Sequence, residues 1–418
     1  MLYSVNTIYL KHLQHVTIRT IISTSRSLSC GISPETPFIQ SRGYERSWQY
    51  ARLQRANFHT TQRLHVSPFT VLLVCSALPI GAIFTGSYAR HFWIKLTPIK
   101  QQQYKKWYWE RRNTFFGSLS LFSSLLLIYW LTHLERDVVE KRRRFIMFDK
   151  DQQAELGTTI FTMLLTKHRN EVIPINDPMY LRLSRILRKL VKSNKEVFEN
   201  TEWTVSIVNE PSPNAMALPG GNVIVFSGLF DIIQNDDQLT FILAHEMSHV
   251  MLSHVVELFS YKVITEIVYT IPAFLIWACF SKWKAFVLYL GVGLLHNIFF
   301  VYPYKRRVEA EADKVGFRLA AKTCIDLREV LIFWELMERY GELTGENKFA
   351  IPLLLTHPSH KKREKWLARQ MPGVLVLRDQ AGCPDLPLID PRDKLSRYLE
   401  ELEKRFHERN MFETFFGK

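Results

Sequence analysis

The sequence predicts an α+β fold that is mainly helical, with a small β-sheet and an N-terminal transmembrane helix. Three observations support this expectation. Several stretches place apolar residues at helical spacing, two short segments have the pattern of strands, and one stretch of 19 residues carries no charge. With 418 residues, 47% of them hydrophobic, the chain is too long for one small domain and too apolar to be disordered.

The first 66 residues have the composition of a mitochondrial presequence. They hold eight basic residues against two acidic ones, which supplies +6 of the formal charge of +14, and they are rich in Ser, Thr and His. They have no long apolar core of the kind that marks a secretory signal. A disordered basic tail is the alternative interpretation. Much of the positive charge therefore needs no nucleic-acid partner, and none is expected.

Residues 67–149 are expected to anchor the chain in a membrane. The uncharged stretch 114–132 is long enough to span a bilayer and has aromatic residues near both ends, so a transmembrane helix is predicted there. Residues 69–84 are a weaker candidate because Pro79 and Gly81 interrupt a shorter apolar run. Six Lys or Arg residues flank each side of 114–132, which leaves its orientation open.

The segment 95–112, just before that span, is both basic and aromatic. Such a composition suits contact with an anionic lipid such as cardiolipin, or a response to the membrane potential. A plain interfacial anchor is the alternative interpretation.

Residues 150–380 have the pattern of a folded domain with an amphipathic helix and two strands, at 203–208 and 222–226. Within it, residues 267–301 form two apolar runs separated by a Lys-Trp-Lys sequence. This apolar hairpin is expected either to enter or line the bilayer, or to be a buried helix pair. Residues 381–418 are charged and predict a solvated helical tail.

The strongest chemical signal is the sequence His245-Glu246-Met-Ser-His249 within a capped helical run. Histidines four residues apart lie on one face of a helix and can share one zinc ion, and Glu246 lies beside them as a base for a water on the metal. A zinc hydrolase also needs a third protein ligand and one open position. His254 is about 180° around the helix from His245, so it is interpreted as structural unless the helix breaks.

A carboxylate on a later helix is the default third ligand. Glu309 and Asp313 are four residues apart and share a helical face with Gly316, a small residue that allows close packing against another helix. Glu311 is rotated by about 200° from Glu309 and should point elsewhere. A surface helix with ion pairs to the preceding arginines is the alternative interpretation.

Together these residues resemble the motifs of the membrane-associated zinc metalloproteases that include the CAAX prenyl protease and bacterial HtpX. The four shared segments occur in order as Asn214-Ala-Met-Ala-Leu-Pro219-Gly220-Gly221, His245-Glu-Met-Ser-His249, Glu309-Ala-Glu-Ala-Asp313 and Thr356-His357-Pro358, the last with Arg363 following. The resemblance covers roughly residues 150–380 and implies a zincin-type (gluzincin) domain. With its basic leader, the chain is similar to the branch in the mitochondrial inner membrane whose activity overlaps that of the m-AAA protease.

The resemblance implies roles for individual residues. One zinc ion per chain would be bound by His245, His249 and Glu309, with Asp313 orienting a ligand histidine and His357 holding the substrate carbonyl or the oxyanion. The strand at 222–226 would pair along its edge with an extended substrate peptide. The implied substrate-binding residues are Asn214, Asn222, Val223, Ile224 and Val225.

The same resemblance implies a setting and a function. The catalytic domain would face the intermembrane space, be activated by stress, undergo autocatalytic cleavage and cleave the dynamin-like GTPase that governs inner-membrane fusion. Its partners would be protein substrates of the inner membrane and the lipid bilayer, with homo-oligomers left open. Two alternatives are a CAAX-type prenyl-protein protease of another membrane, which would need several transmembrane helices, and a non-enzymatic scaffold with structural zinc.

Cys324 and Cys383 are the only cysteines outside the leader and the apolar runs. An oxidising intermembrane space would allow them to form a disulfide, and two buried free thiols are the alternative. No cysteine belongs to a Cys-x-x-Cys pair, so a cysteine-ligated zinc finger is excluded.

Overall fold

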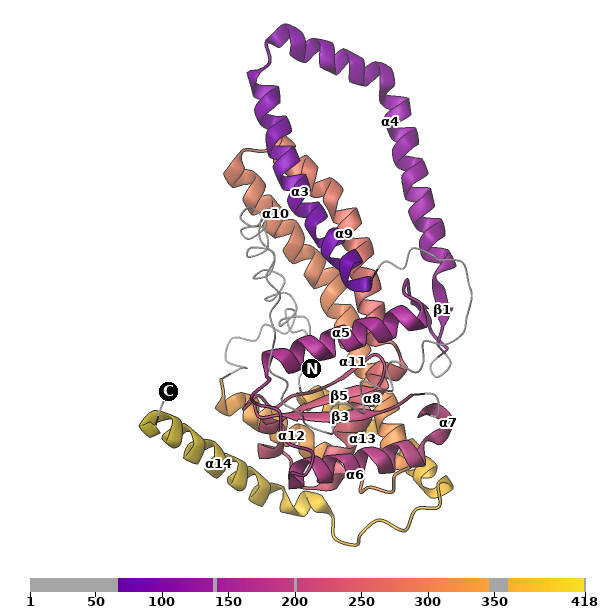
Figure 1. Cartoon of the computed structure of the whole chain (residues 1–418), viewed down its shortest axis with the longest axis vertical. Coiled ribbons are helices and arrows are strands. Elements are labelled where there is room, and N and C mark those ends of the chain that lie inside the picture. Colours follow the sequence, from indigo (N-terminus) through magenta and orange to yellow (C-terminus); the bar gives the residue numbers. More distant parts are fainter. Residues whose placement is uncertain (1–66, 138–140, 199–200, 346–359, 417–418) are drawn as a thin grey trace, which may run out of the picture. The chain divides into compact units, whose positions relative to one another are not determined.

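The structure of the protein, a computed structural model, describes residues 67–137, 141–198, 201–345 and 360–416 (Figure 1). The predicted presequence at 1–66 and the predicted site residue His357 lie outside the described residues. From Pro68 onward the chain forms one unit in which helices predominate and two small sheets occur. This confirms the predicted mainly helical α+β class.

Four helices in the described part of the chain are long and apolar enough to cross a membrane. They are α3 (Pro68–Lys95), α4 (Pro98–Thr132), α9 (His254–Cys279) and the continuous helix Lys282–Ala321. The last of these comprises α10 (Lys282–His296), the π-helical turn η2 (Asn297–Val301) and α11 (Tyr302–Ala321). Large apolar side chains on them are exposed, as lipid-facing side chains would be, and no side chain of α4 is buried.

The expectation of a single transmembrane helix is therefore not confirmed. The predicted span at 114–132 lies in α4, but residues 69–84 also belong to a long helix, in which Pro79 is accommodated and buried. The apolar hairpin at 267–301 is longer than its sequence pattern indicates, because α9 starts at His254 and α10 runs on into α11.

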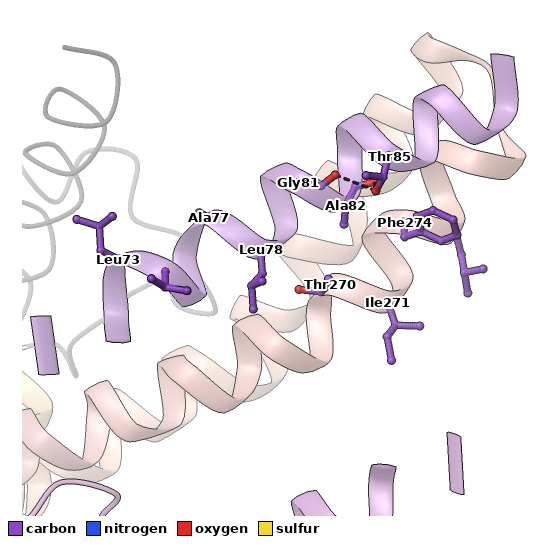
Figure 2. Close-up of a pocket in the computed structure, with 11 residues that line it drawn as sticks. Leu73, Ala77, Leu78, Gly81, Ala82, Thr85, Thr270, Ile271 and Phe274 are labelled. Carbon is purple, nitrogen blue, oxygen red and sulfur yellow. Dashed lines mark hydrogen bonds between the residues drawn. The ribbon is translucent and has the colours of Figure 1, made fainter. Parts of the chain in front are cut away.

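The helices α3 and α9 pack along each other (Figures 1 and 2). A Cβ atom on Gly86 of α3 would lie 2.6 Å from the Phe274 carbonyl oxygen of α9, so only glycine allows this approach. Beside this contact is an apolar groove of about 690 Å³, whose lining includes Leu73, Leu78 and Ile271. The close contact holds α3 against α9, the helix that follows the His245-Glu246-Met-Ser-His249 segment.

A β-hairpin follows α4 and leads into the rest of the unit. Its strands β1 (Leu134–Arg136) and β2 (Arg143–Phe145) are antiparallel. The Phe145 ring is fully buried against Tyr129 of α4 and Tyr261 of α9. The hairpin thus connects the end of α4 to the first turns of α9.

The second sheet has three strands in the order β3-β5-β4. Strand β5 (Asn222–Phe226) is parallel to β3 (Thr204–Val208) on one side and antiparallel to β4 (Ala215–Leu218) on the other. The turn between β4 and β5 needs glycine, because Gly220 and Gly221 have φ values of 90° and 92°. Strands β3 and β4 are the two edges of the sheet; the outer side of β3 carries one isolated bridge, between Val172 and Val208, and all four residues of β4 are buried.

The remaining helices pack around this sheet and one another, and most of them contribute to one apolar core. They are α5 (Lys150–Lys167), α6 (Pro178–Ser193), α7 (Lys195–Phe198), η1 (Ser227–Asp231), α8 (Asp236–Met251), α12 (Glu329–Leu343), α13 (His360–Gln380), η3 (Pro391–Lys394) and α14 (Leu395–Phe416). At the start of α8, the Asn235 side chain accepts hydrogen bonds from the N–H groups of Asp237 and Gln238. Helix α8 contacts α6, α11, α12 and β4, so it is the centre of the domain.

Candidate metal centre

The predicted motif lies on α8, the most enclosed helix of the domain. Every residue from Gln238 to His249 is buried, and the imidazoles of His245 and His249 are each 2% exposed. A histidine pair this far from water needs polar partners, because unpaired ring nitrogens in an apolar core are costly. Those partners come from α11, which packs directly against α8.

The contact between α8 and α11 depends on Gly316. A Cβ atom at this position would lie 2.8 Å from both the Cα and the N atom of His245. The glycine thus brings α11 close enough for the Glu309 and Asp313 side chains, two turns and one turn earlier, to reach the histidines.

The structure brings His245, His249 and Glu309 together. The Nε2 atoms of the two histidines are 3.1 Å apart, and the Glu309 carboxylate lies 3.6 Å from His245 Nε2 and 3.8 Å from His249 Nε2. Two nitrogens bound to a tetrahedral zinc at about 2.0–2.1 Å lie roughly 3.3 Å apart. Among the described residues, only these three form a group that could hold a metal ion. A buried His₂Glu set fits zinc and leaves one tetrahedral position for water or substrate.

Asp313 supports the first histidine. Its Oδ1 atom lies 3.0 Å from His245 Nδ1, which leaves Nε2 facing the other ligands. Arg363 of α13 donates to both Asp313 oxygens, at 2.8 Å and 2.5 Å, and its Nη1 lies 3.3 Å from Glu309 Oε2. The guanidinium also stacks on the Trp334 ring, 3.8 Å from its centroid. Arg363 therefore fixes both carboxylates.

Glu246 has the surroundings of a general base. Its side chain is 3% exposed, and within the described part of the chain its Oε1 atom has no hydrogen-bond partner. Burial raises the pKa of Glu246 to about 7. A carboxylate with this pKa can both take and return a proton near neutral pH.

His254 lies at the site although helical spacing excludes it. Helix α8 ends at Met251, and Ser253 adopts a left-handed conformation with φ 53°, so the chain turns before α9 begins. This break places His254 Nδ1 2.9 Å from His249 Nδ1. His254 does not belong to the group of His245, His249 and Glu309, but it contacts His249.

Glu311 points away from the metal group, as its rotation on the helix indicates. Its carboxylate pairs with Arg142 and Arg144 of the hairpin, at 3.1 Å and 2.9 Å. The alternative of a surface helix paired to the preceding arginines is wrong, because Glu309 and Asp313 are 0% and 2% exposed.

The expected substrate-binding strand needs a correction. Both edges of β5 are hydrogen-bonded within the sheet, so Asn222, Val223, Ile224 and Val225 cannot accept a peptide along their backbone. The Asn222 side chain instead accepts a hydrogen bond from Thr204 Oγ1 at 2.8 Å. Asn214 is 9% exposed and immediately precedes β4, the neighbouring edge strand that contacts α8.

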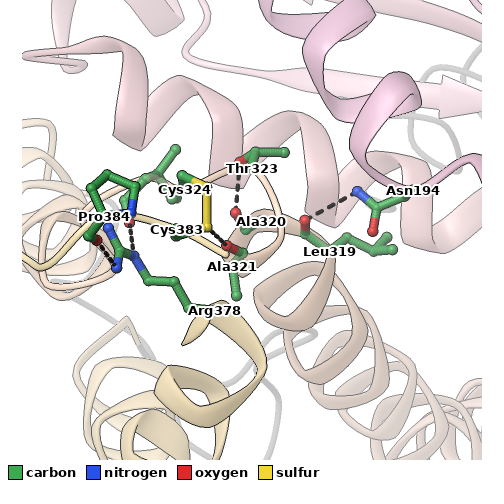
Figure 3. The surroundings of a disulfide bond; sticks show 10 residues. Asn194, Leu319, Ala320, Ala321, Thr323, Cys324, Arg378, Cys383 and Pro384 are labelled. Atoms are coloured by element: carbon green, nitrogen blue, oxygen red, sulfur yellow. Dashed lines mark hydrogen bonds between the residues drawn. A yellow bond between two sulfur atoms is a disulfide. The ribbon is translucent and has the colours of Figure 1, made fainter. Parts of the chain in front are cut away.

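Cys324 and Cys383 form a disulfide (Figure 3). It joins the turn after α11 to the segment after α13, and thus ties together the helices that carry Glu309 and Arg363. Arg378 strengthens the same junction, because its guanidinium donates to the carbonyl oxygens of Ile325 and Pro384.

The buried His-Glu-x-x-His helix, joined by a glutamate from a later helix, defines the class of gluzincin-type metalloproteases. Residues 180–370 match the model of peptidase family M48. The chain is 33% identical over 341 residues to the Danio rerio protein "Metalloendopeptidase OMA1, mitochondrial", which covers 80% of this chain and 71% of that protein. It is also 33% identical to the Homo sapiens protein of the same name over 357 residues, an alignment that covers 83% of this chain and 68% of that protein.

A Saccharomyces cerevisiae protein, "Mitochondrial metalloendopeptidase OMA1", is 26% identical over 284 residues, which covers 64% of this chain and 77% of that protein. The chain belongs to peptidase family M48, together with these OMA1-type metalloendopeptidases. These relatives indicate a mitochondrial metalloendopeptidase, whereas they support the CAAX/HtpX label only loosely.

Proposed function

We propose that the protein is a zinc endopeptidase of the mitochondrial inner membrane that cleaves membrane-proximal segments of other proteins. The observation that carries the proposal is the buried group of His245, His249 and Glu309 with Glu246 beside it. Both ligand helices continue into apolar helices, since α8 is followed by α9 and α11 continues α10. This continuity would hold the site close to the membrane surface.

The chain's own residues perform most of the proposed reaction. When bound, zinc supplies the Lewis acidity that activates a water and polarises the scissile carbonyl. Glu246 takes the proton from the attacking water and delivers it to the leaving amine. Arg363 keeps Asp313 and Glu309 in place, and His357 is proposed to stabilise the oxyanion.

The substrate is proposed to bind as an extended strand along β4. This strand is an edge of its sheet, and it packs against the helix that carries the ligands. Backbone pairing of this kind requires an extended, unfolded segment, because its affinity comes from main-chain hydrogen bonds. By resemblance, the inner-membrane fusion GTPase is the substrate to test first, under conditions of mitochondrial stress.

The catalytic domain is proposed to face the intermembrane space. The disulfide between Cys324 and Cys383 supports this orientation, because disulfides persist in oxidising compartments. Protease protection in intact mitochondria and in mitoplasts would test it directly.

The test of the proposed activity uses the full chain in detergent or nanodiscs, with zinc content and cleavage measured together. The probes are an unstructured peptide and a model membrane protein with a flexible juxtamembrane segment. Glu246→Gln should bind zinc as the wild type does and lose turnover by several orders of magnitude. The matched control is Glu335→Gln, on the exposed side of α12, which should remain active. Residual cleavage by Glu246→Gln near the wild-type rate would refute the proposed base.

The choice of peptide distinguishes the proposed endopeptidase from a prenyl-protein protease. The argument that such an enzyme needs several spans no longer excludes it, since four candidate spans are present in the described residues. The mitochondrial relatives favour the endopeptidase instead. Cleavage that requires a prenyl group on the peptide would overturn the present proposal.

A further inference from the structure

A chain of polar contacts lies behind the zinc ligand His249, on the side away from the other ligands. His249 Nδ1 is 2.9 Å from His254 Nδ1, and His254 Nε2 is 3.4 Å from Glu311 Oε2. His249 and His254 are 2% and 0% exposed, and the Glu311 side chain is 14% exposed. Little water can therefore substitute for these contacts.

The contacts define a single arrangement of protons. If His249 binds zinc through Nε2, its Nδ1 carries the proton and donates it to His254 Nδ1. His254 then carries its own proton on Nε2, which faces the Glu311 carboxylate. His249 thus has an acceptor in His254 Nδ1, whereas His254 Nε2 lies at ion-pair distance from the Glu311 carboxylate, without a hydrogen bond between them.

The carboxylate at the end of this chain is held by the hairpin that follows α4. Arg142 Nε lies 3.1 Å from Glu311 Oε1, and Arg144 Nη2 lies 2.9 Å from Glu311 Oε2. The same two arginines also donate to Glu257 of α9, at distances from 2.6 Å to 2.9 Å. Arg144 is 3% exposed, so this is a buried network and not a set of surface ion pairs.

We propose that His254 is a positioning residue for the zinc ligand His249, and that Arg142 and Arg144 hold it in place through Glu311. The inference rests on the proposed function, because it takes zinc as the metal at this site. Asp313 and Arg363 support His245 from the opposite side. The two ligand histidines would then have separate supports, one from α13 and one from the hairpin next to the membrane.

The expected size of the effect follows from other metal sites. Loss of the group that orients a ligand histidine typically weakens metal binding by about 10–100-fold. His254→Leu would leave the His249 Nδ1–H group buried without an acceptor, which favours a turned imidazole that no longer presents Nε2. His254→Asn would keep an oxygen that can accept from His249 Nδ1, so it should recover much of the affinity.

The first experiment measures zinc affinity of the full chain by competition with a chelator, without any substrate. We expect His254→Leu to bind zinc about 10–100-fold more weakly than wild type, and His254→Asn to fall within several-fold of wild type. The absorption spectrum of the cobalt-substituted proteins should show altered ligand geometry in His254→Leu alone. Wild-type affinity and spectrum in His254→Leu would overturn the inference, and so would equal losses in both variants.

The second experiment tests the hairpin. Glu311→Gln and Arg144→Gln should each weaken zinc binding in the same direction as His254→Leu, and combining either with His254→Leu should add little. Arg143→Gln is the matched control, because Arg143 lies between the two arginines in the sequence and is exposed. If Arg144→Gln does not fold, Glu311→Gln, which preserves side-chain size, carries the test alone. Unchanged zinc affinity in folded Glu311→Gln would refute the role of the hairpin.

Failure of this inference differs visibly from failure of the proposed function. If the wild type binds zinc but cleaves nothing, the proposed function is refuted. The zinc affinities of the variants then still test the inference. If the wild type cleaves the probe and His254→Leu binds zinc as tightly as the wild type, only the inference is refuted. A wild-type chain that binds no zinc fails both.

Discussion

The backbone of His245 lies directly against Gly316, so that a single methyl group between them would have to move α11 away from α8. This contact sets the distance between the helix that carries both histidines and the helix that carries Glu309. The geometry of the metal group therefore depends on a residue that has no side chain.

Gly316→Ala should impair both stability and zinc binding. The added Cβ atom would lie 2.8 Å from the His245 backbone, and overpacking of this kind typically costs about 1–3 kcal/mol. Gly373→Ala in α13 is the matched control, because a Cβ atom there meets nothing within 4 Å and should stabilise the helix by roughly 0.5–1 kcal/mol. Thermal unfolding and zinc titration of both variants measure the difference. A Gly316→Ala variant that binds zinc normally would show that α11 does not need this approach.

Glu246→Gln should stabilise the metal-free protein at high pH. Burial raises the pKa of Glu246 from 4.5 to about 7, so the folded state keeps a proton that the unfolded state has lost between these values. Stability therefore falls as the pH rises through this window, by about 3 kcal/mol at most, whereas the neutral amide of the variant would carry no such penalty. Unfolding of the chelator-treated proteins at pH 5 and pH 8 should show a small gain at pH 5 and nearly the full gain at pH 8.

Glu309→Gln should lose zinc to a far greater extent than Glu311→Gln. Glu309 reaches both ligand nitrogens, whereas Glu311 acts on them only through His254. Replacement of a ligand carboxylate by an amide removes the charge that balances the metal. Metal content after dialysis against a weak chelator ranks the two variants. If zinc stays stoichiometric in Glu309→Gln and is lost from Glu311→Gln, the third ligand is the other carboxylate.

Arg363→Lys should lower kcat/KM despite keeping the charge. The guanidinium holds both oxygens of Asp313 and lies on the Trp334 ring, a combination that an ammonium group cannot reproduce. Arg369→Lys, an exposed substitution on the same helix, is the control and should have no effect. Steady-state cleavage of one peptide by both variants is sufficient. Equal activities of Arg363→Lys and the wild type would mean that Asp313 is oriented without the paired hydrogen bonds of the guanidinium group.

Cys324→Ser should destabilise the domain by about 4 kcal/mol, since the disulfide closes a loop with a sequence separation of 59. Reduction of the wild type should have the same effect, and reduction of Cys324→Ser should have none. Denaturant unfolding with and without reductant gives all four values. If a reductant is shown to open the disulfide but does not lower the stability of the wild type, this account is wrong.

Local spacing predicted the part of the site that lies within single helices. His245 and His249 on α8, and Glu309 and Asp313 on α11, are pairs four residues apart, and the structure brings both pairs together. Helical periodicity also predicted the mainly helical class. Gly316 and the motif resemblance were the sequence signals that the two helices meet.

The rest depends on features that no local pattern contains. His254 reaches the site through the left-handed turn at Ser253, a conformation that serine seldom adopts and that spacing along an unbroken helix excludes. Arg363 follows the His357-Pro358 segment in the sequence, but only the packing of α13 reveals its contact with Asp313, 50 positions earlier. Strand order likewise decides that β5 is central. The span at 69–84 was underrated because a proline is tolerated inside an apolar helix whose neighbours are close.

The continuous helix Lys282–Ala321 has a consequence for which peptide bonds can be reached. Glu309 lies about 12 Å along this helix beyond Val301, at a rise of about 1.5 Å per residue. Under the proposed function, in which this helix spans the membrane, the apolar segment and Glu309 belong to one helix, so the metal group would be held at a fixed distance from the bilayer. The length of a substrate's stalk, more than its sequence, would then determine where it is cut.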